Sequence, residues 1–293
     1  HRQALGHQRR PADVAQAQQL YPTFSSDEIN RFIFALPGNL EAGRITLTRL
    51  ELEYLGIRGD MQDWADAPLL STAERTYRNL FLQDVEAAWR REIPLDAQHQ
   101  GLTTGYELTL RKPVSGTLPS LHTTFDHVTA LSLHGAGAEL RLGAFLQAFP
   151  ALKRLSVRQY SLDALPLSIT NLRQLTQLSL NRTRLRLTPL AANALSGMVN
   201  LEQLDLSDNP LEHIPDTRRL TRLTRLSLSN TGLTEIPADL LSLPPRTYLD
   251  LSHNALENLP DQAFNLPVNV AARVDLSANP LSRPALRRIK AYY

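Results

Sequence analysis

Charged and aromatic residues recur at fixed places in a repeated frame along the second half of the chain. The frame is L-x-x-L-x-L-x-x-N, and it is clearest in LEQLDLSDN, which starts at Leu201. At or beside its third, fifth and seventh positions lie guanidinium, carboxylate and phenol groups, which can form ion pairs and anchoring contacts with another protein. The candidate contact residues are Arg154, Arg158, Arg182, Asp205, Arg225, Tyr248, Asp250, Arg273 and Asp275.

No sequence motif of comparable clarity indicates a catalytic site. The chain contains no cysteine, which excludes thiol nucleophiles, disulfides and zinc–thiolate sites. It also lacks the G-x-S-x-G, P-loop, H-E-x-x-H and dinucleotide-binding sequences. His122 and His127 are five residues apart but have no carboxylate cluster near them, and the histidines of the repeats fall in different coils. We therefore expect no active site, no metal and no cofactor in this chain.

Length and charge narrow the class of protein. The 293 residues are 42% hydrophobic, enough for one or two soluble domains with a continuous core. The net charge of +2 is too small to indicate nucleic-acid binding, and there is no run of 18 apolar residues to cross a membrane. The chain begins at His1 without a signal sequence, so we expect a piece of a longer polypeptide.

The frame that carries the candidate contacts is repeated about eight times. Neighbouring copies start 22 to 26 residues apart, at Gly105, Val128, Leu152, Leu175, Leu201, Leu223, Arg246 and Ala271. A second signal, independent of the leucines, has the same phase: a proline follows the fourth residue of the frame by 11 places in six copies. These prolines are Pro119, Pro166, Pro189, Pro215, Pro237 and Pro260.

This pattern resembles the leucine-rich repeat. The two residues of L-x-L lie on one side of a strand and the residues between them on the other, so each coil should contribute one short strand to a parallel sheet. Eight strands would form a concave face roughly 34 Å long. Asn209, Asn254 and Asn279 should bond backbone groups where the strands end, as a ladder between coils. Because Ala136 and Tyr160 fit that place poorly, we expect the ladder to be least regular in the first coils.

The first hundred residues predict helices instead. Ser25 and Glu28 form a capping-box sequence before an apolar stripe that ends near Pro37, and Ser71 and Glu74 form another. A third stripe runs from Leu47 to Ile57. The fold class is therefore α/β, a right-handed repeat solenoid with a concave parallel sheet, preceded by an α-helical region. We expect a helical cap at 1–100, a solenoid of about eight coils at 101–283 and a helical cap or linker at 284–293.

The sequences flanking the repeats resemble a narrower family. Trp89-Arg90-Arg91 before the repeats, GYELTL and LPSL, the DLS-x-NPL turns and the closing NPLSRPALRRI are similar to effectors of Gram-negative bacteria. In those effectors a leucine-rich domain precedes an all-helical "novel E3 ligase" domain that carries ubiquitin on a cysteine. Since this chain has no cysteine, such a catalytic domain would have to lie beyond Tyr293.

The resemblance implies that the chain selects a host protein for ubiquitin transfer after secretion into the host cytoplasm. It also implies that the chain could restrain its own downstream catalytic domain. Lysine is scarce, at Lys112, Lys153 and Lys290, as expected either for a domain that avoids modifying itself or for a GC-rich gene. The alternative is a stand-alone binding, adhesion or receptor domain without ligase activity. In both cases the partner is a protein on the concave face, centred on Arg154, Arg158, Arg225, Tyr248 and Arg273.

Overall fold

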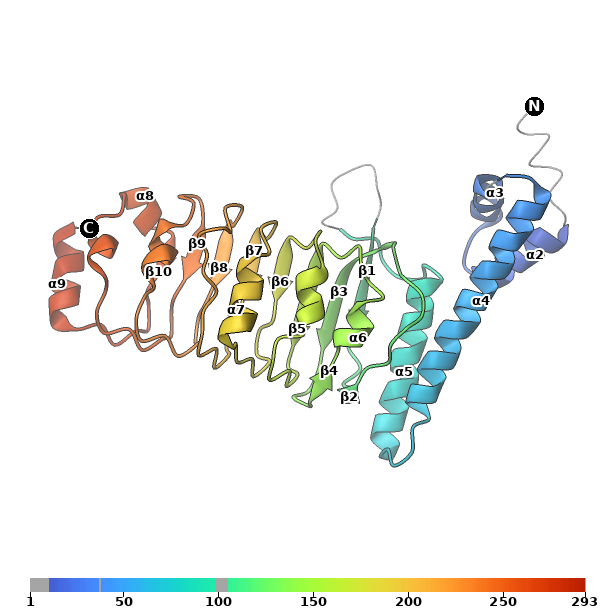
Figure 1. Ribbon diagram of the computed structural model, residues 1–293, viewed down its shortest axis with the longest axis horizontal. Coiled ribbons are helices and arrows are strands. Elements are labelled where there is room, and N and C mark those ends of the chain that lie inside the picture. The colour runs from blue at the N-terminus through green and yellow to red at the C-terminus, as the bar shows by residue number, and fades with distance from the viewer. Residues whose placement is uncertain (1–10, 37, 98–104, 293) are drawn as a thin grey trace.

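The chain folds into an α-helical segment, a solenoid of stacked coils and a closing helix. This computed structural model describes residues 11–36, 38–97 and 105–292, and the segments follow one another along the long axis of the molecule (Figure 1). The proposed boundary between residues 100 and 101, and the positions Pro37 and Tyr293, lie outside the described residues. In the described part, no helix is both long and apolar enough to cross a membrane.

The predicted helices before the repeats are confirmed. They are α3 (Ser26–Ala35), α4 (Leu40–Ala65) and α5 (Thr72–Trp89), preceded by α2 (Pro11–Leu20), which the sequence patterns did not predict. Ser25 caps α3 with both hydrogen bonds of the capping box. The apolar stripes face inward: Ile33, Leu47 and Phe81 are all buried. Helix α5 contacts strand β1 (Tyr106–Leu110), so it covers the amino end of the sheet.

The second capping box forms only in part. The Ser71 hydroxyl accepts a hydrogen bond from the Glu74 amide at 3.0 Å. The Glu74 carboxylate, however, accepts from the Ser115 amide at 2.8 Å and pairs with Arg78 at 3.0 Å. Arg78 is buried and also donates to the carbonyls of Trp64 and Ser115. Glu74 and Arg78 therefore tie α5 to the first coil, because a buried charge pair needs every donor and acceptor satisfied.

The predicted leucine-rich-repeat solenoid is confirmed by the sheet. Each of the eight frames contributes one strand, and all neighbouring pairs are parallel. The leucines of the frame are buried, as Leu204, Leu226 and Leu249 illustrate. After β1 the strands of the sheet are β3 (Val128–His134), β5 (Arg154–Arg158), β6 (Gln177–Ser179), β7 (Gln203–Asp205), β8 (Arg225–Ser227), β9 (Tyr248–Asp250) and β10 (Val274–Asp275).

The chain returns from each strand through short helical or extended segments. Pro166, Pro237 and Pro260 each precede a 3-10 helix, and Pro189 is the first residue of α7. Proline suits these places because the first turn of a helix has no partner for its amide. These segments are α6 (Gly143–Leu146), η1 (Leu167–Asn171), α7 (Pro189–Ser196), η2 (Ala238–Ser242), η3 (Asp261–Phe264) and α8 (Val268–Ala271), with a second small sheet of β2 (Gly116–Thr117) and β4 (Leu140–Arg141).

The predicted asparagine ladder is present in the carboxyl-terminal coils. The Asn209 side chain accepts from the amides of Thr183 and Leu185 and donates to the Leu180 and Leu206 carbonyls, at 2.8 to 3.0 Å. Asn254 and Asn279 make the same kind of bonds to their preceding coils. Thr183 and Thr231 occupy the corresponding place in alternate coils, and each also bonds the next asparagine.

In the first coils a tyrosine replaces the ladder, as the irregular sequence there predicted. Tyr160 is buried, and its hydroxyl donates to the Lys112 carbonyl, two coils back, at 3.3 Å. Its ring lies so close to Gly135 that a Cβ there would be 2.6 Å from it. Burial is the main cause that raises the pKa of the Tyr160 hydroxyl to about 12, so the group stays protonated further into alkali.

A helix lies at the carboxyl end, where the sequence predicted either a helical cap or a linker. Helix α9 (Arg283–Tyr292) packs on η3 with Ala285 buried. The Arg288 guanidinium lies over the Phe264 ring at 3.9 Å and pairs with Asp261 at 3.0 Å. The last coil therefore contacts a helix rather than only solvent.

Candidate recognition surface

The register of the sheet aligns the outward residues in rows that run across all coils. Third positions pair with third positions, as in Gln203 with Arg225 and Arg225 with Tyr248. Fifth positions pair in the same way, as in Ser156 with Ser179. This alignment follows from the repeat itself, because the same leucine must reach the core in every coil. The outward side chains therefore form one continuous surface, which we call the sheet face.

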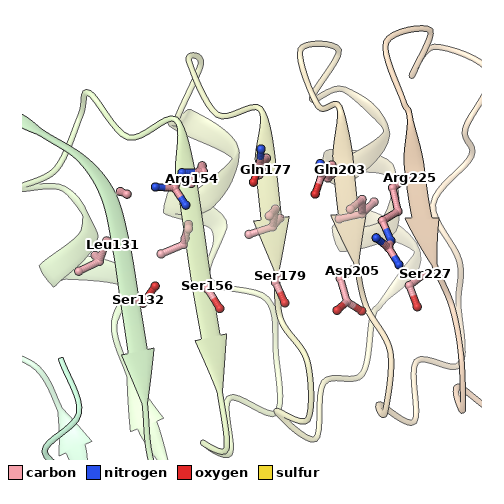
Figure 2. A pocket seen from close by; sticks show the side chains of 14 residues that line it. Leu131, Ser132, Arg154, Ser156, Gln177, Ser179, Gln203, Asp205, Arg225 and Ser227 are labelled. Carbon is pink, nitrogen blue, oxygen red and sulfur yellow. The ribbon is translucent and has the colours of Figure 1, made fainter. Parts of the chain in front are cut away.

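The sheet face is hollowed over its central strands. A depression of about 350 Å³ spans β3, β5, β6, β7 and β8. Figure 2 shows a row of larger polar side chains, Arg154, Gln177, Gln203 and Arg225, beside a row of small ones, Ser132, Ser156 and Ser179, which continues to Asp205 and Ser227. The small row leaves room for the side chains of another molecule, and the longer row offers donors along its edge.

Arg154 is a correction to the predicted set. Its guanidinium pairs with Asp96, and the two side chains are only 19% and 3% exposed. The other oxygen of Asp96 accepts from the Thr129 hydroxyl at 2.9 Å. Arg154 is thus committed to neutralising a buried carboxylate, which would be costly to leave unpaired. Asp96 lies before the repeats, so nothing in the repeat pattern indicated it.

The predicted aspartates have a structural role that the sequence analysis missed. One carboxylate oxygen of Asp205 accepts from both the amide and the hydroxyl of Ser207, at 2.9 and 2.5 Å. Asp250 and Asp275 bond Ser252 and Ser277 in the same way. The recurring D-L-S sequence carried this signal, because an aspartate often bonds the amide two residues ahead. The hydrogen bond from the Ser277 hydroxyl is the main cause that lowers the pKa of Asp275, so this carboxylate stays ionised further into acid.

Three predicted residues gather on the carboxyl-terminal part of the sheet face. The Arg225 guanidinium lies over the Tyr248 ring, 5.5 Å from its centre, and Tyr248 is 43% exposed. Arg273 is exposed and donates to the Arg246 carbonyl. A cation stacked on a tyrosine holds both side chains in defined positions, which lowers the entropy that binding would cost.

The other two predicted arginines lie toward the amino end. Arg158 is the last residue of β5 and is exposed on the sheet face. Arg182 is a second correction: it follows β6 by three residues, in a turn with φ of 55°, and its guanidinium lies 3.7 Å from the Asp208 carboxylate. It therefore belongs to the edge where the strands end and not to the sheet face.

The histidines singled out in the sequence lie apart. His122 pairs with Asp60 at 2.8 Å, and His127 bonds the Ala88 carbonyl at 2.7 Å. Among residues 11–36, 38–97 and 105–292, no three histidine or carboxylate side chains form a group that could hold a metal ion.

Comparisons with known proteins agree with the repeat architecture. The family model described as Leucine Rich Repeat matches residues 200–218. The chain is 34% identical to osteomodulin of Rattus norvegicus over 128 residues, which are 41% of this chain and 30% of that protein. It is 36% identical to vasorin of Mus musculus over 120 residues, 40% of this chain and 18% of that protein. The chain thus spans less than a third of either relative.

Solved structures with a similar fold include bacterial proteins. An internalin from Listeria monocytogenes covers 80% of this chain and 58% of its own, at 15% identity and a TM-score of 0.47. A leucine-rich-repeat protein of Leptospira interrogans covers 62% of this chain and 46% of its own, at 23% identity and a TM-score of 0.47. These two likenesses concern the fold alone; the repeat architecture itself is shown by the eight-stranded parallel sheet and the matched family model.

Proposed function

We propose that this chain recognises a protein partner through the sheet face. The observation that carries the proposal is the aligned face itself: eight parallel strands form one surface, and five of them line a hollow with small serines, edged by glutamine and arginine side chains. Tyrosine and arginine, the residue types that anchor protein interfaces, are stacked together at Arg225 and Tyr248. A hollow that crosses five strands suits a folded surface or an extended segment better than a small molecule.

The binding residues proposed are Arg225, Tyr248 and Arg273, with Arg158 at the opposite end. In Asp205, Asp250 and Asp275, one carboxylate oxygen accepts from a serine and the second can bond a partner. Both signs of charge are therefore available for pairing on the sheet face. Arg154 is not substituted in the test below, because its removal would take the arginine partner away from the buried Asp96 carboxylate.

The test is capture of a host-cell protein by the immobilised chain. The variant Arg225→Glu/Arg273→Glu reverses two charges on the sheet face. The matched control Arg173→Glu/Arg219→Glu reverses two exposed charges in the segments between strands. We expect the wild type and the control to retain a protein that the sheet-face variant does not. The affinity of the sheet-face variant for that protein should be at least tenfold weaker. Equal retention by all three, with folding checked by circular dichroism, would move the binding site off the sheet face.

We further propose that the recognised protein is a substrate for ubiquitin transfer and that the chain acts in a host cell, as part of a bacterial effector. Two observations support this: the flanking sequences that resemble novel E3 ligase effectors, and the presence of only three lysines among 31 basic residues. A recognition arm tethered to a ubiquitin-loaded cysteine would be its own most concentrated acceptor, so few lysines would limit self-modification. A catalytic domain of that kind could also be restrained by this chain.

The coding sequence after Tyr293 tests this second proposal. We expect a helical region with a Cys-x-Asp sequence, and ubiquitin transfer by the longer protein to the captured partner. Heavy self-modification at Lys112, Lys153 and Lys290 would contradict the account of the scarce lysines. Absence of any ligase region would leave a stand-alone binding or receptor domain, in which recognition by the sheet face stands unchanged.

A further inference from the structure

Three basic side chains lie side by side at the seventh position of the first three frames. Arg111 follows the last residue of β1, which pairs with Leu133, so it stands beside His134. His134 in turn pairs with Arg158 on β5. Adjacent strands are about 4.8 Å apart, and the residues flanking these positions, such as Leu133 and Val157, are buried. The three side chains therefore project from the same edge of the sheet face.

Among the residues that the structure describes, no carboxylate forms an ion pair with this group. Neither Arg111 nor Arg158 forms an ion pair with a described residue, whereas Arg154 pairs with Asp96 and Arg182 lies near Asp208. The charged groups that act on His134 are the same two arginines, one from each neighbouring strand. Burial, and then both arginines, lower the pKa of His134, and no acidic group raises it. Lys112, the residue after Arg111, instead interacts electrostatically with the Asp84 carboxylate of α5.

Two guanidinium groups that form no ion pair with a described residue create a positive field at this end of the face. The guanidinium groups of Arg111 and Arg158, on or just after the two strands that flank β3, can each donate hydrogen bonds to one oxyanion set between them, and the His134 imidazole can donate another. The three residues therefore have the composition of an anion-binding site. Arg154, on the same face, differs in this respect, because the Asp96 carboxylate lies within reach and pairs with it.

We infer that Arg111, His134 and Arg158 form an anion-binding subsite that takes a phosphoryl or carboxylate group of the protein bound on the sheet face. The inference rests on the proposed recognition function and specifies what the partner presents at the amino end: a phosphorylated residue or a cluster of Asp and Glu. Both sources share an oxyanion with several acceptor lone pairs, and the probes below distinguish them.

The test measures binding of three fluorescent nonapeptides by anisotropy. They have the same sequence except at the centre, which holds phosphoserine, glutamate or serine. We expect the phosphoserine or glutamate peptide to bind and the serine peptide not to. The variant Arg111→Gln/Arg158→Gln should weaken binding at least tenfold, and the control Arg173→Gln/Arg219→Gln, which removes the same charge elsewhere, should not. Tighter binding of phosphoserine identifies a phosphoryl group, and equal binding of both identifies any carboxylate-like anion.

A second readout follows His134 directly. In NMR titrations, inorganic phosphate should raise the pKa of His134, because an anion offsets the two arginines. The same addition should leave the pKa of His122, which pairs with Asp60, almost unchanged. No rise at His134 and no peptide binding at millimolar concentration would overturn the subsite. A captured protein that the Arg111→Gln/Arg158→Gln variant retains at full affinity would also overturn it, while leaving recognition by the rest of the sheet face intact.

Discussion

At the scale of residues, one backbone conformation recurs in every coil from the third to the last. The residue just before the ladder position has a positive φ, between 52° and 58°, in six successive coils. None of these six is glycine, although the left-handed region disfavours residues with a Cβ. They are Gln159, Arg182, Asp208, Asn230, His253 and Ala278. The strand must turn sharply there to leave the sheet, so each coil carries a small strain that its buried leucines and ladder bonds offset.

Gln159→Gly should therefore stabilise the protein. Gln159 is exposed, with φ of 57°. Glycine would relieve about 1–2 kcal/mol of left-handed backbone strain and lose about 0.5–1 kcal/mol to the freer unfolded chain, so the net gain should be about 0.5–1 kcal/mol. The matched control is Gln174→Gly, an exposed glutamine in a turn where φ is not positive. There glycine only adds freedom to the unfolded chain, and the free energy of unfolding should fall by about 0.5–1 kcal/mol. Urea denaturation of both variants checks the opposite signs; two changes of the same sign would contradict the strain argument.

At the scale of elements, the junction between the helices and the solenoid depends on polar contacts as well as apolar packing. Arg78 and Glu74 of α5 bond the Ser115 backbone, and Arg154 of β5 bonds Asp96. His127 bonds the carbonyl of Ala88, near the end of α5, and its ring lies 5.5 Å from that of Tyr106. These contacts fix the orientation of the helical segment on the first coil, because each hydrogen bond has a direction that apolar packing lacks.

The burial of His127 predicts that the junction weakens in acid. Burial is the main cause that lowers the pKa of His127 from 6.5 to about 4. Between these values the unfolded chain binds a proton that the folded protein does not, so the free energy of unfolding falls as pH drops from 6.5 to about 4. The loss should be at most about 3 kcal/mol, since the ring is only half-buried.

Urea denaturation across this pH range measures the effect. His127→Gln, which keeps a donor for the Ala88 carbonyl, should flatten the dependence between pH 6.5 and 4. His122→Gln is the control: the Asp60 hydrogen bond raises the pKa of His122, so its contribution is present below pH 6.5 and is lost as pH rises. An unchanged acid slope in His127→Gln would show that other groups cause it.

At the scale of the whole molecule, stability is the sum of coils and of the contacts between neighbours. The central coils bury their leucines on both sides: Leu204 and Leu226 are each 1% exposed. In the last strand, β10, the side chains of Val274 and Asp275 are only partly buried. Opening of the solenoid should therefore begin at the carboxyl end, while α5 and the polar junction hold the amino end.

A pair of leucine truncations tests this gradient. Leu226→Ala in β8 should lower the free energy of unfolding by about 3 kcal/mol or more, because it leaves a cavity between two packed coils. Leu276→Ala, in the partly buried last coil, should cost only about 1 kcal/mol. Hydrogen exchange should show faster opening of β9 and β10 than of β5 and β6 in the wild type. Equal costs, or uniform exchange along the sheet, would indicate a single cooperative unit instead.

The sequence alone determined the coils, the strand positions and the order of side chains on the sheet face. These follow from a local rule, since the leucines of each frame must reach the core and the residues between them must then face outward. It could not determine which outward residues are free. Arg154 pairs with Asp96, 58 residues away in the sequence. The Glu74 carboxylate accepts a hydrogen bond from the Ser115 amide instead of completing the capping box with Ser71. Such pairings depend on where the helical segment docks against the first coil, and that is decided by packing in three dimensions, which no periodicity along the chain records.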